Sequence, residues 1–184
     1  MELPRLFLAC FFSHALVTGC DLNLFKSKGI VPNYLPTTPK KECKVTYDDH
    51  SIDCGCTESR GNVLQKPTVS FPADKEKYYS VIMIGPDAPL VSPFLHWLVQ
   101  NVPGDRVDQG DTCSVYIPPL PCLFFLDPHR YVISVYEQPH KFEEGSSDIM
   151  NKLKLNLVRN NFDLKEFAKS CSLIGPICGN FFYV

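Results

Sequence analysis

Two histidines, a tyrosine and an aspartate are the side chains of this sequence that could act together. His129 and Tyr131 lie two residues apart at the start of a β-rich run, so they share one strand face while Arg130 points to the other. His96 begins a second such run, and Asp87 lies in a proline-bounded turn that ends a third. We expect these strand ends to form a small polar cavity. Imidazolium N–H and phenol O–H groups donate hydrogen bonds, and charged donors bind phosphate more strongly than neutral ones, which favours an anion such as phosphate as the ligand.

Each of these residues also has other interpretations. A single histidine on a strand is more often a core residue, and Asp87 can simply cap its turn. Arg130 suits a fixed ion pair with Asp87 or Asp127. In an enzymatic interpretation, His96 and His129 are the acid and base of a hydrolase, with Asp87 as the third group. The sequence has no G-x-S-x-G, H-E-x-x-H or Gly-rich phosphate motif, so we expect no enzyme, no catalytic residue, no metal and no cofactor.

The amino-acid composition is typical of one globular domain. The 184 residues are 45% hydrophobic and 21% charged, and the formal net charge is −2. The 18 basic residues form no run or stripe, which excludes the electrostatic pattern of a nucleic-acid-binding protein. No apolar run reaches the roughly 18 residues of a membrane-spanning helix. We therefore expect a soluble monomer that spans no membrane.

The N-terminus is typical of a secretory leader. Arg5 precedes an apolar run over 6–16, and small residues follow up to Gly19. We predict a signal peptide over 1–19 and a secreted single domain over 20–184. A second interpretation is a bacterial lipobox, in which Cys20 would carry lipid.

The mature chain keeps eight of the nine cysteines, an even number that predicts up to four disulfides in an oxidising compartment. Sequence alone does not fix their connectivity. A zinc site built on Cys54-Gly55-Cys56 with His50 is the alternative, although its one-residue spacing is unusual for structural zinc.

Strands outnumber helices in the expected secondary structure. The segment 20–65 reads as a disulfide-stapled N-terminal elaboration of short edge strands and loops. We predict strands over 67–72, 78–84, 95–102 and 131–138, a long proline-rich loop over 103–128, and one amphipathic helix from about 146 to about 161. In the apolar tail 171–184, Gly175-Pro176 and Gly179-Asn180 are expected to be turns. The fold class is therefore mainly β.

Four motifs in order over about residues 67–167 resemble those of the phosphatidylethanolamine-binding protein family, which includes the Raf kinase inhibitor proteins and the plant flowering regulators. The motifs are Gly85-Pro86-Asp87-Ala88-Pro89, which resembles D-P-D-x-P; His96-Trp97-Leu98-Val99 with Asn101 and Gly104; Pro118-Pro119; and His129-Arg130-Tyr131-Val132 with Tyr136-Glu137-Gln138. The leader and the cysteines are similar to a secreted branch of that family.

The resemblance implies a fold with a large central antiparallel sheet, a smaller sheet and a C-terminal helical segment. It also implies a surface pocket for phosphate or a phospholipid head group. Carried over residue by residue, the ligand-binding set is Asp87, Pro89, Phe94, His96, Pro119, His129 and Tyr131. Phe94 stands where the family usually has Trp, Gly85 replaces the first Asp of the signature, and Asp127 replaces a Gly. The segment 120–127 is longer than the usual loop.

The function we expect is that of a secreted, non-enzymatic binding protein that acts as a modulator or scaffold. Its partner would be a phosphate-like anion, a phospholipid head group or another protein. The alternative from the same resemblance is an extracellular protease inhibitor that acts by surface contact.

Overall fold

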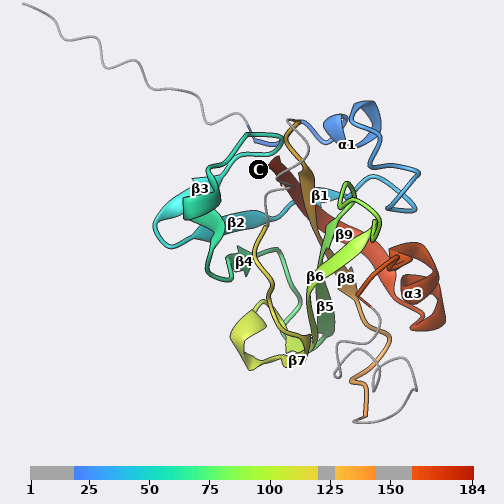
Figure 1. Cartoon of the computed structure of the whole chain (residues 1–184). Coiled ribbons are helices and arrows are strands. Elements are labelled where there is room, and N and C mark those ends of the chain that lie inside the picture. The colour runs from blue at the N-terminus through green and yellow to red at the C-terminus, as the bar shows by residue number, and fades with distance from the viewer. Residues whose placement is uncertain (1–18, 120–126, 144–158) are drawn as a thin grey trace, which may run out of the picture.

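A large sheet forms the centre of the molecule (Figure 1). The computed structural model describes residues 19–119, 127–143 and 159–184. Within these ranges the sheet has six strands in the order β1-β9-β8-β5-β6-β7, with β1 parallel to β9 and the other neighbours antiparallel. The strands are β1 (Lys41–Glu42), β5 (Tyr78–Gly85), β6 (Phe94–Pro103), β7 (Asp111–Ser114), β8 (Arg130–Glu137) and β9 (Ile174–Tyr183). The expected large, mainly antiparallel sheet is confirmed.

The central strands β5, β6 and β8 coincide with three of the predicted β-rich runs. They are rich in Val, Ile and Tyr, and nearly every residue in them is buried. Side chains alternate between faces along a strand, so burial of consecutive residues means that both faces of this sheet are covered.

The C-terminal tail forms the ten-residue strand β9, so the prediction of two turns in it is wrong. β9 pairs with β8 along its length, and the register shifts near Gly175-Pro176. Gly179 lies within the strand because its missing side chain lets Pro39 pack against the backbone. A Cβ atom at Gly179 would lie 2.6 Å from Cγ of Pro39. Gly179 therefore allows a close tertiary contact, although Gly-Asn in a sequence is typical of a turn.

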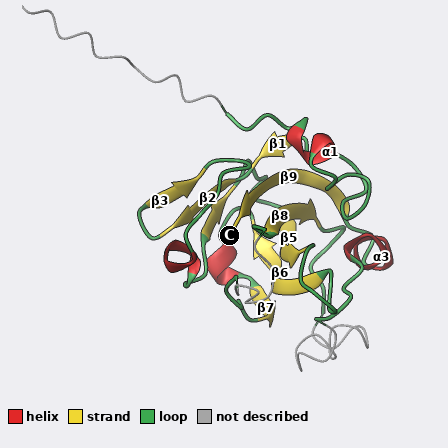
Figure 2. Ribbon diagram, turned by 45° about the horizontal axis from the view of Figure 1, so that its top comes forward, coloured by secondary structure: helices red, strands yellow, loops and turns green. Residues whose placement is uncertain are grey.

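A second sheet covers one face of the large sheet, which we call the small-sheet face. Its strands are β2 (Lys44–Tyr47), β3 (His50–Ile52) and β4 (Thr68–Ser70), in the antiparallel order β3-β2-β4. Figure 2 shows it to one side of the strongly curved large sheet. Val81 and Met83 of β5 lie in the core between the two sheets. Asn180 of β9 joins the layers, because its buried Nδ2 donates to the carbonyls of Cys43 and Ile52 at 3.0 and 3.1 Å.

The opposite face, which we call the helix face, is covered by the N-terminal segment and by the two helices α1 (Leu24–Ser27) and α3 (Leu164–Ser170). Ile82 and Ile84 point to this side. The expected C-terminal helical segment is therefore present. The sequence feature that starts helix α3 is its N-cap in residues 163–166. Asp163 caps the helix by accepting a hydrogen bond from the Glu166 N–H at 3.0 Å.

The described chain contains one disulfide within the N-terminal segment 20–65 and one that joins this segment to β9. They join Cys20 to Cys54 and Cys43 to Cys178. Cys54 therefore has no thiolate for zinc, and the Cys20 sulfur is not available for lipid attachment, so both alternatives are wrong. Cys56 and Cys171 are thiols, and they pack against opposite faces of the large sheet, which keeps them apart.

The described part of the segment 103–128 contains regular structure that the sequence does not predict. Its proline-rich sequence indicates a loop, but β7 pairs with β6 and is preceded by a short 3-10 helix, η2 (Val107–Gln109). The helix predicted from 146 lies outside the described residues up to 158, and residues 159–161 are not helical. Among the described residues, no helix is long and apolar enough to cross a membrane.

Candidate functional site

The ends of β5, β6 and β8 meet at one edge of the large sheet. Gly85 of β5 is the register partner of Phe94 in β6, and Ile84 is the partner of Val132 in β8. The strand alternation then places Tyr131 on the small-sheet face beside Gly85. The three strand ends therefore lie side by side, with Gly85, His96 and Tyr131 as neighbours at this edge.

A β-bulge directs His96 toward this edge. Ile84 pairs with Leu95 and Met83 pairs with Trp97, so one step in β5 corresponds to two steps in β6 and His96 is the extra residue. A bulge of this kind re-aims a side chain. The imidazole consequently contacts the Tyr131 ring edge to face, with 5.1 Å between ring centroids.

The His96 imidazole is buried among aromatic rings. Only 5% of the residue is exposed, and the Phe94 ring packs against it at 4.9 Å between centroids. Burial lowers the pKa of His96 to about 4, and the positive charge of Arg159 adds to this effect. The hydrogen bond to the Ile117 carbonyl opposes the shift without reversing it. His96 is therefore uncharged at neutral pH.

The hydrogen bond of His96 also fixes which ring nitrogen carries the proton. Nδ1 lies 2.7 Å from the carbonyl oxygen of Ile117, and a carbonyl oxygen can only accept. Nδ1 is thus the donor, and Nε2 presents a lone pair. Nε2 has no protein partner among the described residues and is not among their fully buried unpaired atoms. The expectation that His96 donates to an anion as an imidazolium is therefore wrong, because the buried ring offers an acceptor instead.

Gly85 leaves the space that the His96 ring occupies. A Cβ atom at Gly85 would lie 2.7 Å from Nε2 and 3.1 Å from Cδ2 of His96, and 3.5 Å from Cε1 of Tyr131. The carboxylate that the family signature carries at this position could not coexist with this imidazole placement. The glycine at this position is therefore what allows the His96 imidazole its present orientation.

The Tyr131 hydroxyl is the second polar group available at this edge. The residue is 4% exposed, and its ring stacks on Phe182 with 5.7 Å between centroids. Burial, together with the negative charge of Asp87, raises the pKa of Tyr131 to about 12, so the phenol keeps its proton. Within the described ranges the hydroxyl has no hydrogen-bond partner and is not one of the fully buried unpaired atoms. It remains available as a donor.

Asp87 is held by Arg130. The backbone N–H and Nε of Arg130 donate to Oδ2 of Asp87 at 2.8 and 2.9 Å, and a terminal guanidinium nitrogen donates to Oδ1 at 2.5 Å. Burial alone would raise the pKa of Asp87, but the Arg130 hydrogen bonds outweigh it and lower the pKa. The ion pair expected between these two residues is confirmed. Asp87 fixes the turn after β5, and we find no contact that directs it to a ligand.

The remaining predicted residues are His129, Pro89 and Pro119. His129 is half-buried, and its backbone exchanges two hydrogen bonds of 3.0 Å with Val184. Its imidazole lies close enough to Asp87 to help lower the pKa of that carboxyl. Pro89 is half-buried in the turn after β5, and Pro119 is buried at the end of a described range. Among the described residues, no hydrogen bond or ring contact joins these two prolines to His96.

Sequence reasoning missed Arg159. This residue is 4% exposed and donates to the carbonyls of Leu95 at 2.9 Å, His96 at 3.2 Å and Val115 at 2.8 Å. It therefore holds the backbone of the bulge in place behind the imidazole. An arginine at the end of a predicted helix resembles an ordinary C-terminal charge, so its local sequence gives no signal for this role.

Comparison with known proteins identifies the family of this chain. The family model described as phosphatidylethanolamine-binding protein matches residues 43–173. The "26 kDa secreted antigen" of Toxocara canis is 33% identical over 171 residues, covering 89% of this chain and 63% of the antigen. "Putative odorant-binding protein A5" of Drosophila melanogaster is 32% identical over 200 residues, covering 99% of this chain and 90% of that protein.

A solved structure supports the same fold. The crystal structure of carboxypeptidase Y inhibitor complexed with the cognate proteinase matches with a TM-score of 0.70 and 21% identity, covering 88% of this chain and 93% of that chain. This match shows the fold alone. The family model, by contrast, spans well over half of the chain, and the Drosophila relative is similar along nearly all of it. The chain therefore belongs to the phosphatidylethanolamine-binding protein family.

Proposed function

We propose that this chain is a secreted, non-enzymatic binding protein that takes a phosphate-like anion or phospholipid head group at the edge formed by β5, β6 and β8. The observation that carries the proposal is the pair of neighbouring polar atoms without protein partners among the described residues, Nε2 of His96 and the hydroxyl of Tyr131. In this role the protein acts as a modulator or scaffold. The two disulfides support secretion, because such bonds persist in oxidising compartments.

The acceptor on His96 specifies which anion fits best. A phosphate monoester loses its second proton with a pKa of about 6, so part of it still carries an O–H at neutral pH. That O–H can donate to Nε2 of His96, while the charged oxygens accept from the Tyr131 hydroxyl and from His129. Gly85 also removes a carboxylate that would repel the anion.

The experiment compares phosphate and phosphorylethanolamine, which keep part of their second proton near pH 6.5, with sulfate, which has none. We expect phosphate and phosphorylethanolamine to bind at least about tenfold more tightly than sulfate at pH 6.5 by NMR titration, because sulfate has no proton to donate to Nε2. Equal affinity for phosphate and phosphorylethanolamine would indicate free phosphate recognition, and tighter binding of the ester would indicate the head group.

A matched pair of variants locates the site. Tyr131→Phe removes only the available hydroxyl and should weaken phosphate binding about tenfold. Tyr116→Phe is the control, because its hydroxyl already bonds the Val63 carbonyl at 2.7 Å and lies in the core between the sheets. If phosphate binds no more tightly than sulfate, or if both variants bind like the parent chain, the proposal fails.

The low pKa of His96 supports the non-enzymatic part of the proposal. General acid and base groups work best with a pKa near the operating pH. Burial lowers the pKa of His96 to about 4, which suits neither role at neutral pH. Turnover of a phosphate or carboxylate ester that disappears in His129→Ala would favour the hydrolase alternative instead.

Extracellular protease inhibition by surface contact is the second candidate, and Leu90 is the observation that favours it. This side chain is fully exposed at the turn between β5 and β6. The turn is held at both ends, since Asp87 binds Arg130 and the N–H of Asn161 donates to the Val91 carbonyl at 2.9 Å. A preorganised apolar anchor of this kind is typical of tight protein interfaces. One solved structure with this fold is a carboxypeptidase inhibitor.

An inhibition assay separates the two candidates. If the chain inhibits a serine carboxypeptidase or endopeptidase through the turn, Leu90→Lys should abolish inhibition while Tyr131→Phe leaves it unchanged. Ile174 is a matched control, since it is 52% exposed on β9, and Ile174→Lys should not alter inhibition. Equal effects of both lysine variants would argue against an inhibitory turn.

A further inference from the structure

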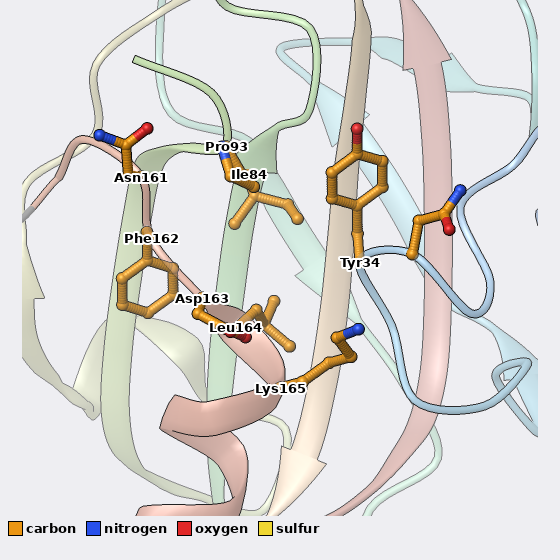
Figure 3. A pocket seen from close by; sticks show the side chains of 9 residues that line it. Tyr34, Ile84, Pro93, Asn161, Phe162, Asp163, Leu164 and Lys165 are labelled. Atoms are coloured by element: carbon orange, nitrogen blue, oxygen red, sulfur yellow. The ribbon is translucent and has the colours of Figure 1, made fainter.

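A cavity of about 270 Å³ lies on the helix face, away from the residues of the anion site. Figure 3 shows it between the N-terminal segment that carries Tyr34 and the segment from Asn161 to Lys165 that leads into α3. Ile84 points into it, whereas Tyr131 and His96 lie toward the small-sheet face. The cavity and the anion site are therefore on opposite sides of the large sheet.

The floor of this cavity is apolar and its rim is polar. The floor consists of Ile84, Leu164 and Phe162, which are 0%, 2% and 5% exposed and belong to the core. Asn33 and Asn161 lie at the exposed rim. An apolar body with a few convergent polar groups is the usual form of a small-molecule site.

The rim has hydrogen-bonding capacity that the protein does not use. The side-chain amide of Asn161 has no partner among the described residues, and in Asn33 only Nδ2 is engaged, donating to the Gly29 carbonyl at 3.0 Å. Both a donor and an acceptor are thus available. The charges of Lys165 and Asp163 oppose each other, so the rim carries no net charge to select an ion.

We propose that this cavity binds a small neutral amphiphile, an alcohol with an aromatic or short aliphatic body. At about 270 Å³ the cavity lies just below the range of about 300–1,000 Å³ that is usual for ligand sites, so it suits a small molecule. That size is too small for a helix or strand of a partner protein. A hydroxyl group both donates and accepts, which matches the two amides, whereas the charge of a carboxylate would have no net opposite charge at the rim to offset its loss of water.

The test uses 2-phenylethanol, which has nine heavy atoms, and phenylacetate as the charged comparator. Titration of the mature chain is followed by the methyl NMR signals of Ile84 and Leu164. Val69, which lines a separate cavity of about 220 Å³ beside Trp97, is the internal control. We expect 2-phenylethanol to shift the first two residues but not Val69, with a Kd of about 0.1–1 mM for a ligand of this size.

Two variants make the assignment specific. Asn33→Trp places a large ring at the exposed rim and should weaken binding at least about tenfold. Asn161 has a φ of 53°, a left-handed conformation that glycine tolerates, so Asn161→Gly removes the amide without backbone strain. It should weaken binding about threefold to tenfold, while Asn160→Gly, at the exposed neighbour outside the cavity, should not.

Three results would overturn the proposal. The first is the absence of Ile84 and Leu164 shifts at 10 mM 2-phenylethanol, and the second is tighter binding of phenylacetate than of the alcohol. The third is binding that neither Asn33→Trp nor Asn161→Gly weakens. Tyr131→Phe, which tests the anion site, should leave binding of the alcohol unchanged, so the two sites are judged independently.

Discussion

Replacing Gly85 by alanine tests whether the missing side chain is what allows His96 its place. The backbone of Gly85 is not left-handed, so only space opposes the added methyl group. That Cβ would lie 2.7 Å from Nε2 of His96, whereas carbon and nitrogen atoms in contact lie about 3.5 Å apart. The imidazole would therefore have to move by about 0.8 Å.

The His96 ring has little freedom to make this movement. It is 5% exposed, lies between the rings of Phe94 and Tyr131, and is bound through Nδ1 to the Ile117 carbonyl. Overpacking of a core costs about 1–3 kcal/mol. Removing the flexibility of a glycine from the unfolded chain returns about 0.4–1 kcal/mol. We expect Gly85→Ala to lower the free energy of unfolding by about 1–2 kcal/mol.

Urea denaturation and an NMR titration of the His96 ring measure both consequences. Displacement of the ring should reduce its burial, so its pKa should rise from about 4 toward the ordinary value. Gly61→Ala is the matched control, because a Cβ there would meet only the Ser59 hydroxyl, at 3.9 Å. If the two alanine variants are equally stable and the pKa of His96 does not change, the reasoning about this close contact is wrong.

The same pKa predicts how stability depends on pH. The unfolded chain binds a proton at His96 with a pKa near 6.5, and the folded chain does so with a pKa of about 4. Between these values the unfolded state binds more protons, so stability falls as the pH falls. The contribution of His96 is about 3 kcal/mol above pH 6.5 and is lost toward pH 4. In His96→Gln, the stability measured by urea denaturation should change less over this range.

Three further changes test the supports of the fold and the site. Arg130→Met should lower the free energy of unfolding by about 2 kcal/mol in urea, because the Asp87 carboxylate loses its partner, and a loss below about 0.5 kcal/mol would contradict this. Gln138→Leu should cost about 3 kcal/mol by the same assay, since Oε1 of Gln138 accepts from the Asn101 N–H at 2.7 Å within a buried network. Removing the Cys43–Cys178 disulfide by a double alanine substitution should cost about 2–4 kcal/mol in thermal unfolding, and an unchanged Tm would refute its role.

Local patterns in the sequence predict a large part of the fold. The β-rich runs that become β5, β6 and β8 are long and apolar, so their propensity and their burial agree. The expected ion pair of Arg130 depends on charge complementarity between nearby strand ends, and it forms with Asp87. The resemblance to the family then places these strands in one large sheet.

The tail shows where local patterns fail. Gly179-Asn180 looks like a turn, yet it lies within β9 because Pro39 packs against the glycine and the asparagine bonds backbone carbonyls of the N-terminal segment. These partners are more than 100 residues away in sequence. A turn signal and a close-packing signal use the same residue types, and only the distant partners distinguish them.

Motif order and strand alternation are local properties, and they predict that His96 and Tyr131 lie close together. What His96 can do there depends on the tertiary structure. The bulge that aims the ring, the burial that removes its charge and the Ile117 carbonyl that fixes its proton all come from other segments. Hydrogen-bond partners and desolvation depend on the packed environment, so a histidine that reads as a donor in the sequence is an acceptor in the folded protein.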